Sequence, residues 1–167
     1  LLEHVAEIEI GAQDISPFGA GAYTGEVNAM QVKEFAEYAI IGHSERRKNF
    51  GETDELLEQK VKQALSEDVT PIFCVQDEHT PVPSGVTIVA YEPIAAIGTG
   101  HPDTPENADR VTKSLRERQP QIEQVLYGGS VTPGDVHSFT SMEHIDGVLV
   151  GGASLDASKF LSIIENA

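Results

Sequence analysis

Short runs of apolar residues alternate along this chain with longer segments in which apolar residues recur every three or four positions. Runs of the first kind are typical of strands buried on both faces, and segments of the second kind are typical of amphipathic helices. Six strands are predicted, at residues 5–14, 39–44, 70–76, 86–93, 123–130 and 144–153. Helices are predicted at residues 28–38, 53–68, 104–119, 132–142 and 156–167. This alternation predicts an α/β fold with a parallel sheet.

Two helix starts are well marked in the sequence, and one connection is unusual. Thr53 is a candidate N-cap, as is Thr104, which Pro105 follows at a position where proline fits the first helical turn. The link at residues 77–85 is polar and contains two prolines, and it has no helical pattern. Parallel strands are usually joined by about a dozen residues or more, so this link is short for its predicted place.

Length and composition narrow the class of protein. The 167 residues are enough for one domain, which we assign to residues 1–167, and 40% of them are apolar. The formal charge of -16 opposes non-specific binding to nucleic acid or to an anionic membrane. With Cys74 as its one cysteine the chain has no internal disulfide framework. It also has no apolar run of the ~20 residues that span a bilayer and no recognisable signal peptide. We therefore expect a cytoplasmic protein.

Glycines follow several of the predicted strands, at the edge where parallel α/β proteins bind ligands. They lie at residues 98–100, 128–130 and 151–152. Glycine lets the backbone approach a ligand closely, and free N–H groups at the start of a helix attract anions. Together the three turns indicate a phosphate-binding site that uses no lysine. The alternative is that each is an ordinary tight turn.

Glu92 and His43 are the side chains at this edge that could do chemistry. Glu92 ends an apolar strand and is followed by Pro93, and a carboxylate shielded from water is a better base. His43 precedes the short helical pattern SERRK, whose positive end would favour a neutral imidazole that donates a hydrogen bond. The alternatives are an arginine partner for Glu92 and a structural role for His43. The other histidines lack metal-ligand spacing, so they are expected to be surface or structural residues.

Five segments occur in an order that resembles the triosephosphate isomerase family: GAYTGEV, IIGHSERRKNFGETDELLEQKV, AYEPIAAIGTG, LYGGSVTPGDV and DGVLVGGASL. The resemblance covers nearly the whole chain except residues 80–86. It implies a TIM (β/α) barrel-type parallel sheet. It also implies an isomerase that interconverts glyceraldehyde 3-phosphate and dihydroxyacetone phosphate through an enediolate, without a cofactor or metal, in glycolysis and gluconeogenesis.

The resemblance implies a role for each matching residue. Glu92 is the base, His43 polarises the carbonyl oxygen and Glu45 supports both. The residues implied in phosphate binding are Gly98, Ser130, Gly151 and Gly152. The residues implied in a closing lid are Pro93, Ile97, Thr99 and Gly100, with Tyr127 as the latch of its closed form. The Gly21–Val27 segment corresponds to a loop that enters the neighbouring subunit, so a homodimer is expected.

The chain also departs from the family pattern. The family barrel has eight strands and typically ~250 residues, whereas this chain matches only strands three to eight. The first two βα units are absent, together with an active-site N-x-K segment whose lysine neutralises the substrate phosphate. The helix between family strands five and six is missing as well, and Ala95 stands where many members carry tryptophan. Two alternatives remain: a non-catalytic phosphate-binding fragment or module of this family, and a barrel isomerase for another sugar phosphate.

Overall fold

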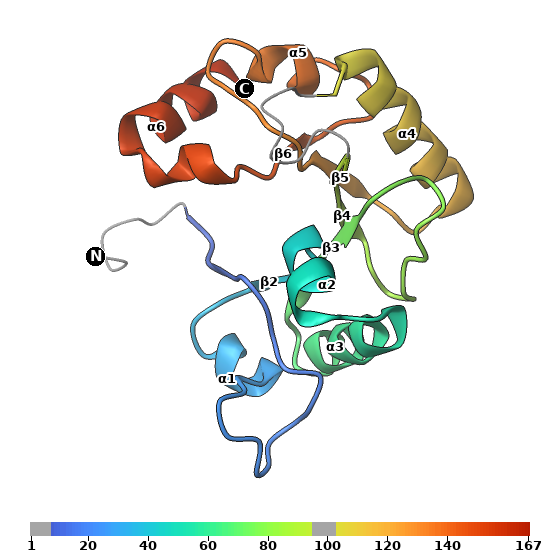
Figure 1. Ribbon diagram of the computed structural model, residues 1–167, viewed down its shortest axis with the longest axis vertical. Coiled ribbons are helices and arrows are strands. Elements are labelled where there is room, and N and C mark those ends of the chain that lie inside the picture. The colour runs from blue at the N-terminus through green and yellow to red at the C-terminus, as the bar shows by residue number, and fades with distance from the viewer. Residues whose placement is uncertain (1–7, 95–102) are drawn as a thin grey trace.

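The computed structural model describes residues 8–94 and 103–167, which form a single parallel sheet with helices around it (Figure 1). The strands lie side by side in chain order: β1 (Gly11–Ala12), β2 (Tyr38–Ile41), β3 (Thr70–Val75), β4 (Ile88–Tyr91), β5 (Gln124–Tyr127) and β6 (Gly147–Val148). Every pairing is parallel. The sheet curls into a half-barrel with β1 and β6 at its two edges. The predicted truncated barrel is thereby confirmed.

The helices follow the strands as the sequence pattern predicts. They are α1 (Ala29–Lys33), α2 (Ser44–Phe50), α3 (Asp54–Ser66), α4 (Pro105–Arg118), α5 (Val136–Thr140) and α6 (Ala157–Asn166), with a 3₁₀ turn η2 (Gly152–Leu155) before the last. The side chain of Thr53 accepts a hydrogen bond from the N–H of Leu56, and that of Thr104 accepts one from Asn107. Both predicted N-caps are confirmed. None of the described helices is long and apolar enough to cross a bilayer.

The two edge strands are much shorter than predicted. Only Gly11–Ala12 pairs within the predicted strand at residues 5–14, of which residues 5–7 lie outside the described part of the chain. Only Gly147–Val148 pairs within residues 144–153. An edge strand forms backbone hydrogen bonds with one neighbouring strand only. An apolar sequence is therefore not enough to keep many of its residues paired. The predicted helices at residues 28–38 and 132–142 are likewise reduced to α1 and α5.

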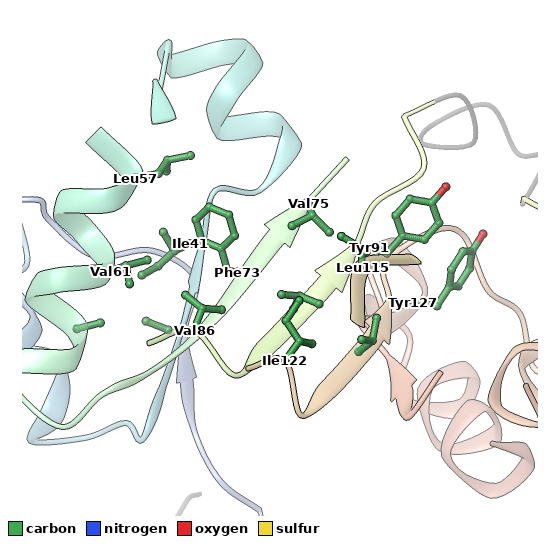
Figure 2. Packing of buried hydrophobic residues seen from close by; sticks show 14 of the residues in the cluster. Ile41, Leu57, Val61, Phe73, Val75, Val86, Tyr91, Leu115, Ile122 and Tyr127 are labelled. Atoms are coloured by element: carbon green, nitrogen blue, oxygen red, sulfur yellow. The ribbon is translucent and has the colours of Figure 1, made fainter. Parts of the chain in front are cut away.

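The core lies between the sheet and the helices α3 and α4 (Figure 2). Leu57 of α3 and Phe73 of β3 are almost fully buried, as is Leu115 of α4. Burying each such side chain contributes roughly 1.5–3 kcal/mol. Val82 of the link at residues 77–85 packs against this core, and Val86, which directly follows the link, is fully buried in it. The link thus contributes apolar contacts although it contains no helix, as the sequence predicts.

The Gly21–Val27 segment lies between β1 and α1, away from the sheet. All of its residues are exposed. The ring of Tyr23 stacks on that of Phe18, with centroids 4.3 Å apart, so the chain's own contacts give this loop a defined form. A homodimer formed through this loop stays a prediction.

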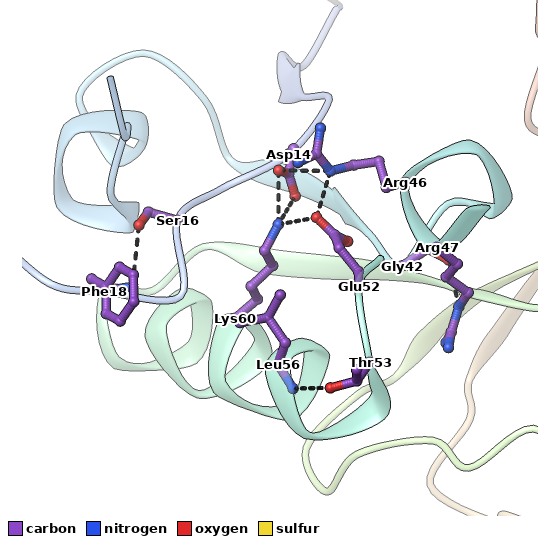
Figure 3. Close-up of polar contacts among 10 residues, drawn as sticks. All are labelled: Asp14, Ser16, Phe18, Gly42, Arg46, Arg47, Glu52, Thr53, Leu56 and Lys60. Carbon is purple, nitrogen blue, oxygen red and sulfur yellow. Dashed lines mark hydrogen bonds and ion pairs between the residues drawn. The ribbon is translucent and has the colours of Figure 1, made fainter. Parts of the chain in front are cut away.

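A cluster of four charged side chains joins the end of β1 to α2 and α3 (Figure 3). The Nζ of Lys60 lies 2.6 Å from Asp14 Oδ1 and 2.6 Å from Glu52 Oε1. The Nε of Arg46 lies 2.8 Å from Asp14 Oδ2 and 2.7 Å from Glu52 Oε1. Burial raises the pKa of Asp14, and the hydrogen bond from Lys60 opposes that shift. Since the Lys60 side chain is only 3% exposed, its charge is stabilised by these two carboxylates in place of water.

Replacing Lys60 by methionine should therefore destabilise the protein strongly. Lys60→Met keeps the length of the side chain but leaves Arg46 alone to balance Asp14 and Glu52. Breaking a buried pair in this way typically costs ~3 kcal/mol or more. Urea denaturation followed by circular dichroism measures the change in the free energy of unfolding.

Lys62→Met is the matched control for this measurement. Lys62 pairs with Glu58 on the same helix at 2.7 Å, but its side chain is 69% exposed. Exposed pairs of this kind contribute ~1 kcal/mol or less. Equal losses of stability in the two variants would contradict the buried-cluster interpretation.

Candidate active site

A cavity of about 530 Å³ opens at the carboxyl ends of the strands. On one side it is bounded by residues that follow β1 and β2, among them Gln13, His43 and Glu45. On the other side it is bounded by the segment after β6, including Gly151 and Gly152. The structure therefore brings four of the predicted site residues to one cavity, namely His43, Glu45, Gly151 and Gly152. This is the ligand face expected for parallel α/β folds.

Glu92 lies directly after β4, where its backbone N–H donates to the carbonyl oxygen of Val75 at 2.8 Å. Its side chain is 1% exposed. One carboxylate oxygen accepts a hydrogen bond from the backbone N–H of Ser44 at 2.9 Å, and the other lies 2.9 Å from Nε2 of His43. The predicted burial of this carboxylate is confirmed. Its partners are a histidine and a helix start, and the alternative of an arginine partner finds no support among the described residues.

His43 is the N-cap of α2, and both nitrogens of its imidazole ring contact other groups. Nδ1 accepts a hydrogen bond from the backbone N–H of Glu45 at 3.3 Å, which places the proton of the neutral ring on Nε2. Nε2–H then points at the carboxylate of Glu92. That hydrogen bond raises the pKa of His43, whereas burial lowers it. On balance the pKa of His43 is raised, chiefly by Glu92, whereas the sequence pattern predicted a helix start that favours the neutral ring.

Two neighbours of Glu92 were not singled out for this role in the sequence. Cys74 of β3 is fully buried, and it lies close enough to Glu92 for that carboxylate to act on its thiol. Burial, together with the charge and hydrogen bond of Glu92, raises the pKa of the Cys74 thiol well above its usual value. Gly128 was read as part of a phosphate turn, yet a Cβ there would lie 3.1 Å from Cγ of Glu92. Strand order could have indicated both, since β3 and β5 flank β4.

Four of the remaining predicted residues lie outside the described part of the chain, namely Ile97, Gly98, Thr99 and Gly100. The others are described, and among them Pro93 is buried next to Glu92. Ser130 is exposed and is not among the residues that bound the cavity. Tyr127 is fully buried, and burial raises its pKa to about 12.

Tyr127 contacts the segment that follows the predicted lid. Its hydroxyl accepts a hydrogen bond from the backbone N–H of Asp103 at 3.1 Å. The hydroxyl of Tyr91 donates to the carboxylate of the same Asp103 at 3.3 Å. Tyrosines of two strands, β4 and β5, therefore hold Asp103 just before the start of α4. A latch at Tyr127 stays a prediction, to which this contact gives a structural basis.

The contact between His43 and Glu92 predicts a change in titration. In Glu92→Gln the carboxylate is lost, so the effect that raises the pKa of His43 disappears and the desolvation that lowers it remains. His43 should then lose its proton at a lower pH than in the unmodified protein. A pH titration of the imidazole followed by NMR measures this, with His137 as an internal reference. An unchanged or higher pKa of His43 in the variant would refute the contact.

The space beside Gly128 generates a second prediction. A Cβ at this position would also lie 3.1 Å from the carbonyl oxygen of Tyr91, so neighbouring atoms have to move. Gly128→Ala should lower the free energy of unfolding by ~1–3 kcal/mol, as overpacking usually does. Gly134→Ala is the control, because its Cβ would come no nearer than 3.9 Å to Thr132 Oγ1. Chemical denaturation compares the two, and an equal effect would show that Gly128 is not held in a tight space.

The chain is similar to known proteins both in sequence and in structure. The sequence matches the triosephosphate isomerase family over residues 1–167. It is 43% identical to triosephosphate isomerase of Herminiimonas arsenicoxydans, over 96% of this chain and 77% of that protein. It is 41% identical to that of Thermus thermophilus, over 99% of this chain and 80% of that protein. The structure resembles the crystal structure of triosephosphate isomerase from Bartonella henselae, with a TM-score of 0.80, 30% identity and coverage of 93% and 74% of the two chains. The chain therefore belongs to the triosephosphate isomerase family.

Proposed function

We propose that this chain interconverts glyceraldehyde 3-phosphate and dihydroxyacetone phosphate. The observation that carries the proposal is the contact of the buried Glu92 carboxylate with His43, which itself bounds a cavity large enough for a triose phosphate. Membership of an isomerase family supports the same reaction class. The rival interpretation, a non-catalytic phosphate-binding module, receives no support from relatives that are named as isomerases.

Proton transfer by Glu92 is the chemical step in this proposal. The carboxylate removes a proton from the carbon next to the substrate carbonyl, and the electron pair of that C–H bond forms an enediolate. The same carboxylate then returns the proton to the neighbouring carbon while the hydroxyl proton passes from one substrate oxygen to the other, so that no oxidant or reductant is needed. Glu92 has to leave His43 and Ser44 to reach a substrate in the cavity, since its side chain is buried against them.

His43 would change partners in the same event. Its Nε2–H bonds to Glu92 in this structure, and it becomes available when the carboxylate moves toward the substrate. A hydrogen bond from Nε2 to the substrate carbonyl oxygen then stabilises the charge that develops on the enediolate. The backbone N–H of Glu45 keeps the ring in the required tautomer throughout.

The glycines after β6 are proposed to bind the phosphate. Gly151 and Gly152 bound the cavity opposite His43, and Gly152 begins the 3₁₀ turn η2. Free N–H groups at the start of such a turn favour an anion. We further propose a cytoplasmic homodimer formed through the Gly21–Val27 loop, and catalysis without a metal or cofactor.

The family's N-x-K segment has no counterpart in this sequence, which limits the expected rate. An electrostatic contribution of this kind is worth ~3 kcal/mol. Turnover by this chain alone should therefore be ~10²-fold slower than that of a relative that carries the lysine.

Isomerase activity of the purified chain, compared with that of Glu92→Gln, tests the proposal. The variant keeps the size of the side chain but cannot accept a proton from carbon, so turnover should fall to the level of the assay without protein. Glu123→Gln, an exposed position beside β5, controls for charge and for traces of host enzyme carried through purification. Equal rates in Glu92→Gln and Glu123→Gln would reject Glu92 as the base. Absence of turnover in the unmodified chain, with phosphate still bound, would favour the binding module.

A further inference from the structure

Asp103 directly precedes Thr104, the N-cap of α4, and it contacts the ends of two strands. Its backbone N–H donates to the Tyr127 hydroxyl at 3.1 Å, and its carboxylate accepts from the Tyr91 hydroxyl at 3.3 Å. Tyr91 is the last residue of β4 and Tyr127 is the last residue of β5, and the two lie opposite each other in the sheet. Asp103 therefore ties the start of α4 to the carboxyl end of the sheet.

The carboxylate of Asp103 is fixed by donors from its own helix. The amide nitrogen of Asn107 lies 3.0 Å from Oδ1 and 2.8 Å from Oδ2, and the backbone N–H of Thr104 donates to Oδ1 at 2.8 Å. Several donors on one carboxylate restrict its orientation, so that little entropy is lost when it accepts a further hydrogen bond. The acceptor for the Tyr91 hydroxyl is therefore held in place before that contact is made.

The two tyrosines depend on Asp103 because they are buried. Tyr91 is 5% exposed and Tyr127 is 0% exposed, so their hydroxyls need partners from the protein. Burial, and after it the charge of Asp103, raises the pKa of Tyr91, so its hydroxyl keeps the proton that it donates. In Figure 2 the two rings extend from neighbouring strands with their hydroxyl groups pointing the same way.

The contact between Tyr91 and Asp103 closes the base of the connection that carries the proposed base. Glu92 is the first residue of the connection after β4, and Asp103 lies at its other end, before α4. The hydrogen bond from Tyr91 therefore joins the two ends of this connection. Glu92 has to move to reach a substrate in the cavity, and a movement of this kind is reproducible only if its starting point is fixed.

The end of β5 belongs to the same arrangement. The N–H of Gly128, which follows Tyr127, donates to the carbonyl oxygen of Tyr91 at 2.7 Å. A Cβ at Gly128 would lie 3.1 Å from Cγ of Glu92, so this strand end also borders the carboxylate. Asp103 thus holds the two strand ends between which Glu92 is placed.

From these contacts we infer that Asp103 is a positioning residue for the proposed base: its carboxylate holds Tyr91, and with it the strand end from which Glu92 reaches the substrate. This role rests on the proposed function, because it concerns the same base. Neither Asp103 nor Tyr91 bounds the cavity, so Asp103 acts through the strand end and not by touching the substrate.

Steady-state kinetics of Asp103→Asn tests the inference. The variant keeps the size of the side chain, but it loses the charge and turns an amide donor toward Asn107 or Tyr91. Because a displaced reacting group costs rate steeply, kcat should fall ~10-fold while KM changes little. Asp109→Asn is the matched control, since Asp109 lies on the same helix and accepts from the N–H and Nδ1 of His144 at 2.9 and 3.0 Å. Equal kcat values in the two variants would overturn the inference.

A double-mutant cycle tests whether Asp103 acts through Tyr91. Tyr91→Phe removes the hydroxyl and keeps the ring in the core, so it should lower kcat by a similar factor. The double variant should then lower kcat no further, because both changes remove the same contact. Losses that add up in the double variant would overturn the inference. Tyr91→Phe also tests the contact by itself if Asp103→Asn fails to fold.

A third readout does not depend on turnover. The hydrogen bond from Glu92 raises the pKa of His43, so a displaced Glu92 raises it less. In Asp103→Asn the imidazole of His43 should therefore lose its proton at a lower pH than in the unmodified protein, measured by NMR with His137 as the reference. An unshifted His43 would overturn the inference even if the unmodified chain proves to be an active isomerase. A shifted His43 in a chain without turnover would reject the proposed reaction and support the positioning role.

Discussion

Hydrogen bonding between parallel strands in a fixed register is the constraint on which the candidate site depends. β3 pairs with β2 on one side, where Phe73 lies opposite Ile41, and with β4 on the other, where Val75 lies opposite Tyr91. The residues that follow β2 and β4 therefore leave the sheet at the same edge, where His43 meets Glu92. Because side chains alternate between the faces of a strand, a slip of one residue would remove the cavity-facing groups altogether.

The buried carboxylate imposes a second constraint on the residues around it. Glu92 is almost inaccessible to water, so its oxygens need donors from the protein, and Ser44 and His43 supply them. It also needs room, which Gly128 leaves by lacking a side chain. The same requirement explains why Glu92 and His43 contact each other in this structure, since each provides the hydrogen-bond partner that the other needs.

The half-barrel leaves apolar side chains exposed to solvent, and a buried cluster of charged side chains fixes one of its edges. Residues that follow the two edge strands bound the cavity. Apolar residues of η2 and α6, which come after β6, are well exposed, with Leu155 at 91%, Leu161 at 58% and Ile164 at 56%. The chain spans 77% of its Herminiimonas relative, and its described residues form six strands, where the barrel of the family has eight. The cluster around Lys60 ties β1 to α2 and α3, and so fixes an edge strand that has a neighbouring strand on one side only.

The sequence by itself determined the fold class, the order of six strands and the starts of α3 and α4, because apolar periodicity and N-cap side chains act over a few neighbouring residues. It also identified Glu92 and His43, since both follow apolar runs at strand ends. Only the tertiary structure decided the shortness of β1 and β6, which depends on having one neighbour each, and the contacts of Cys74 and Gly128 with Glu92. It alone brought Arg46 of α2 against Asp14 and Glu52, which lie outside that helix. Contacts of that kind join segments far apart in the chain, and their geometry exists only once the sheet has brought those segments together.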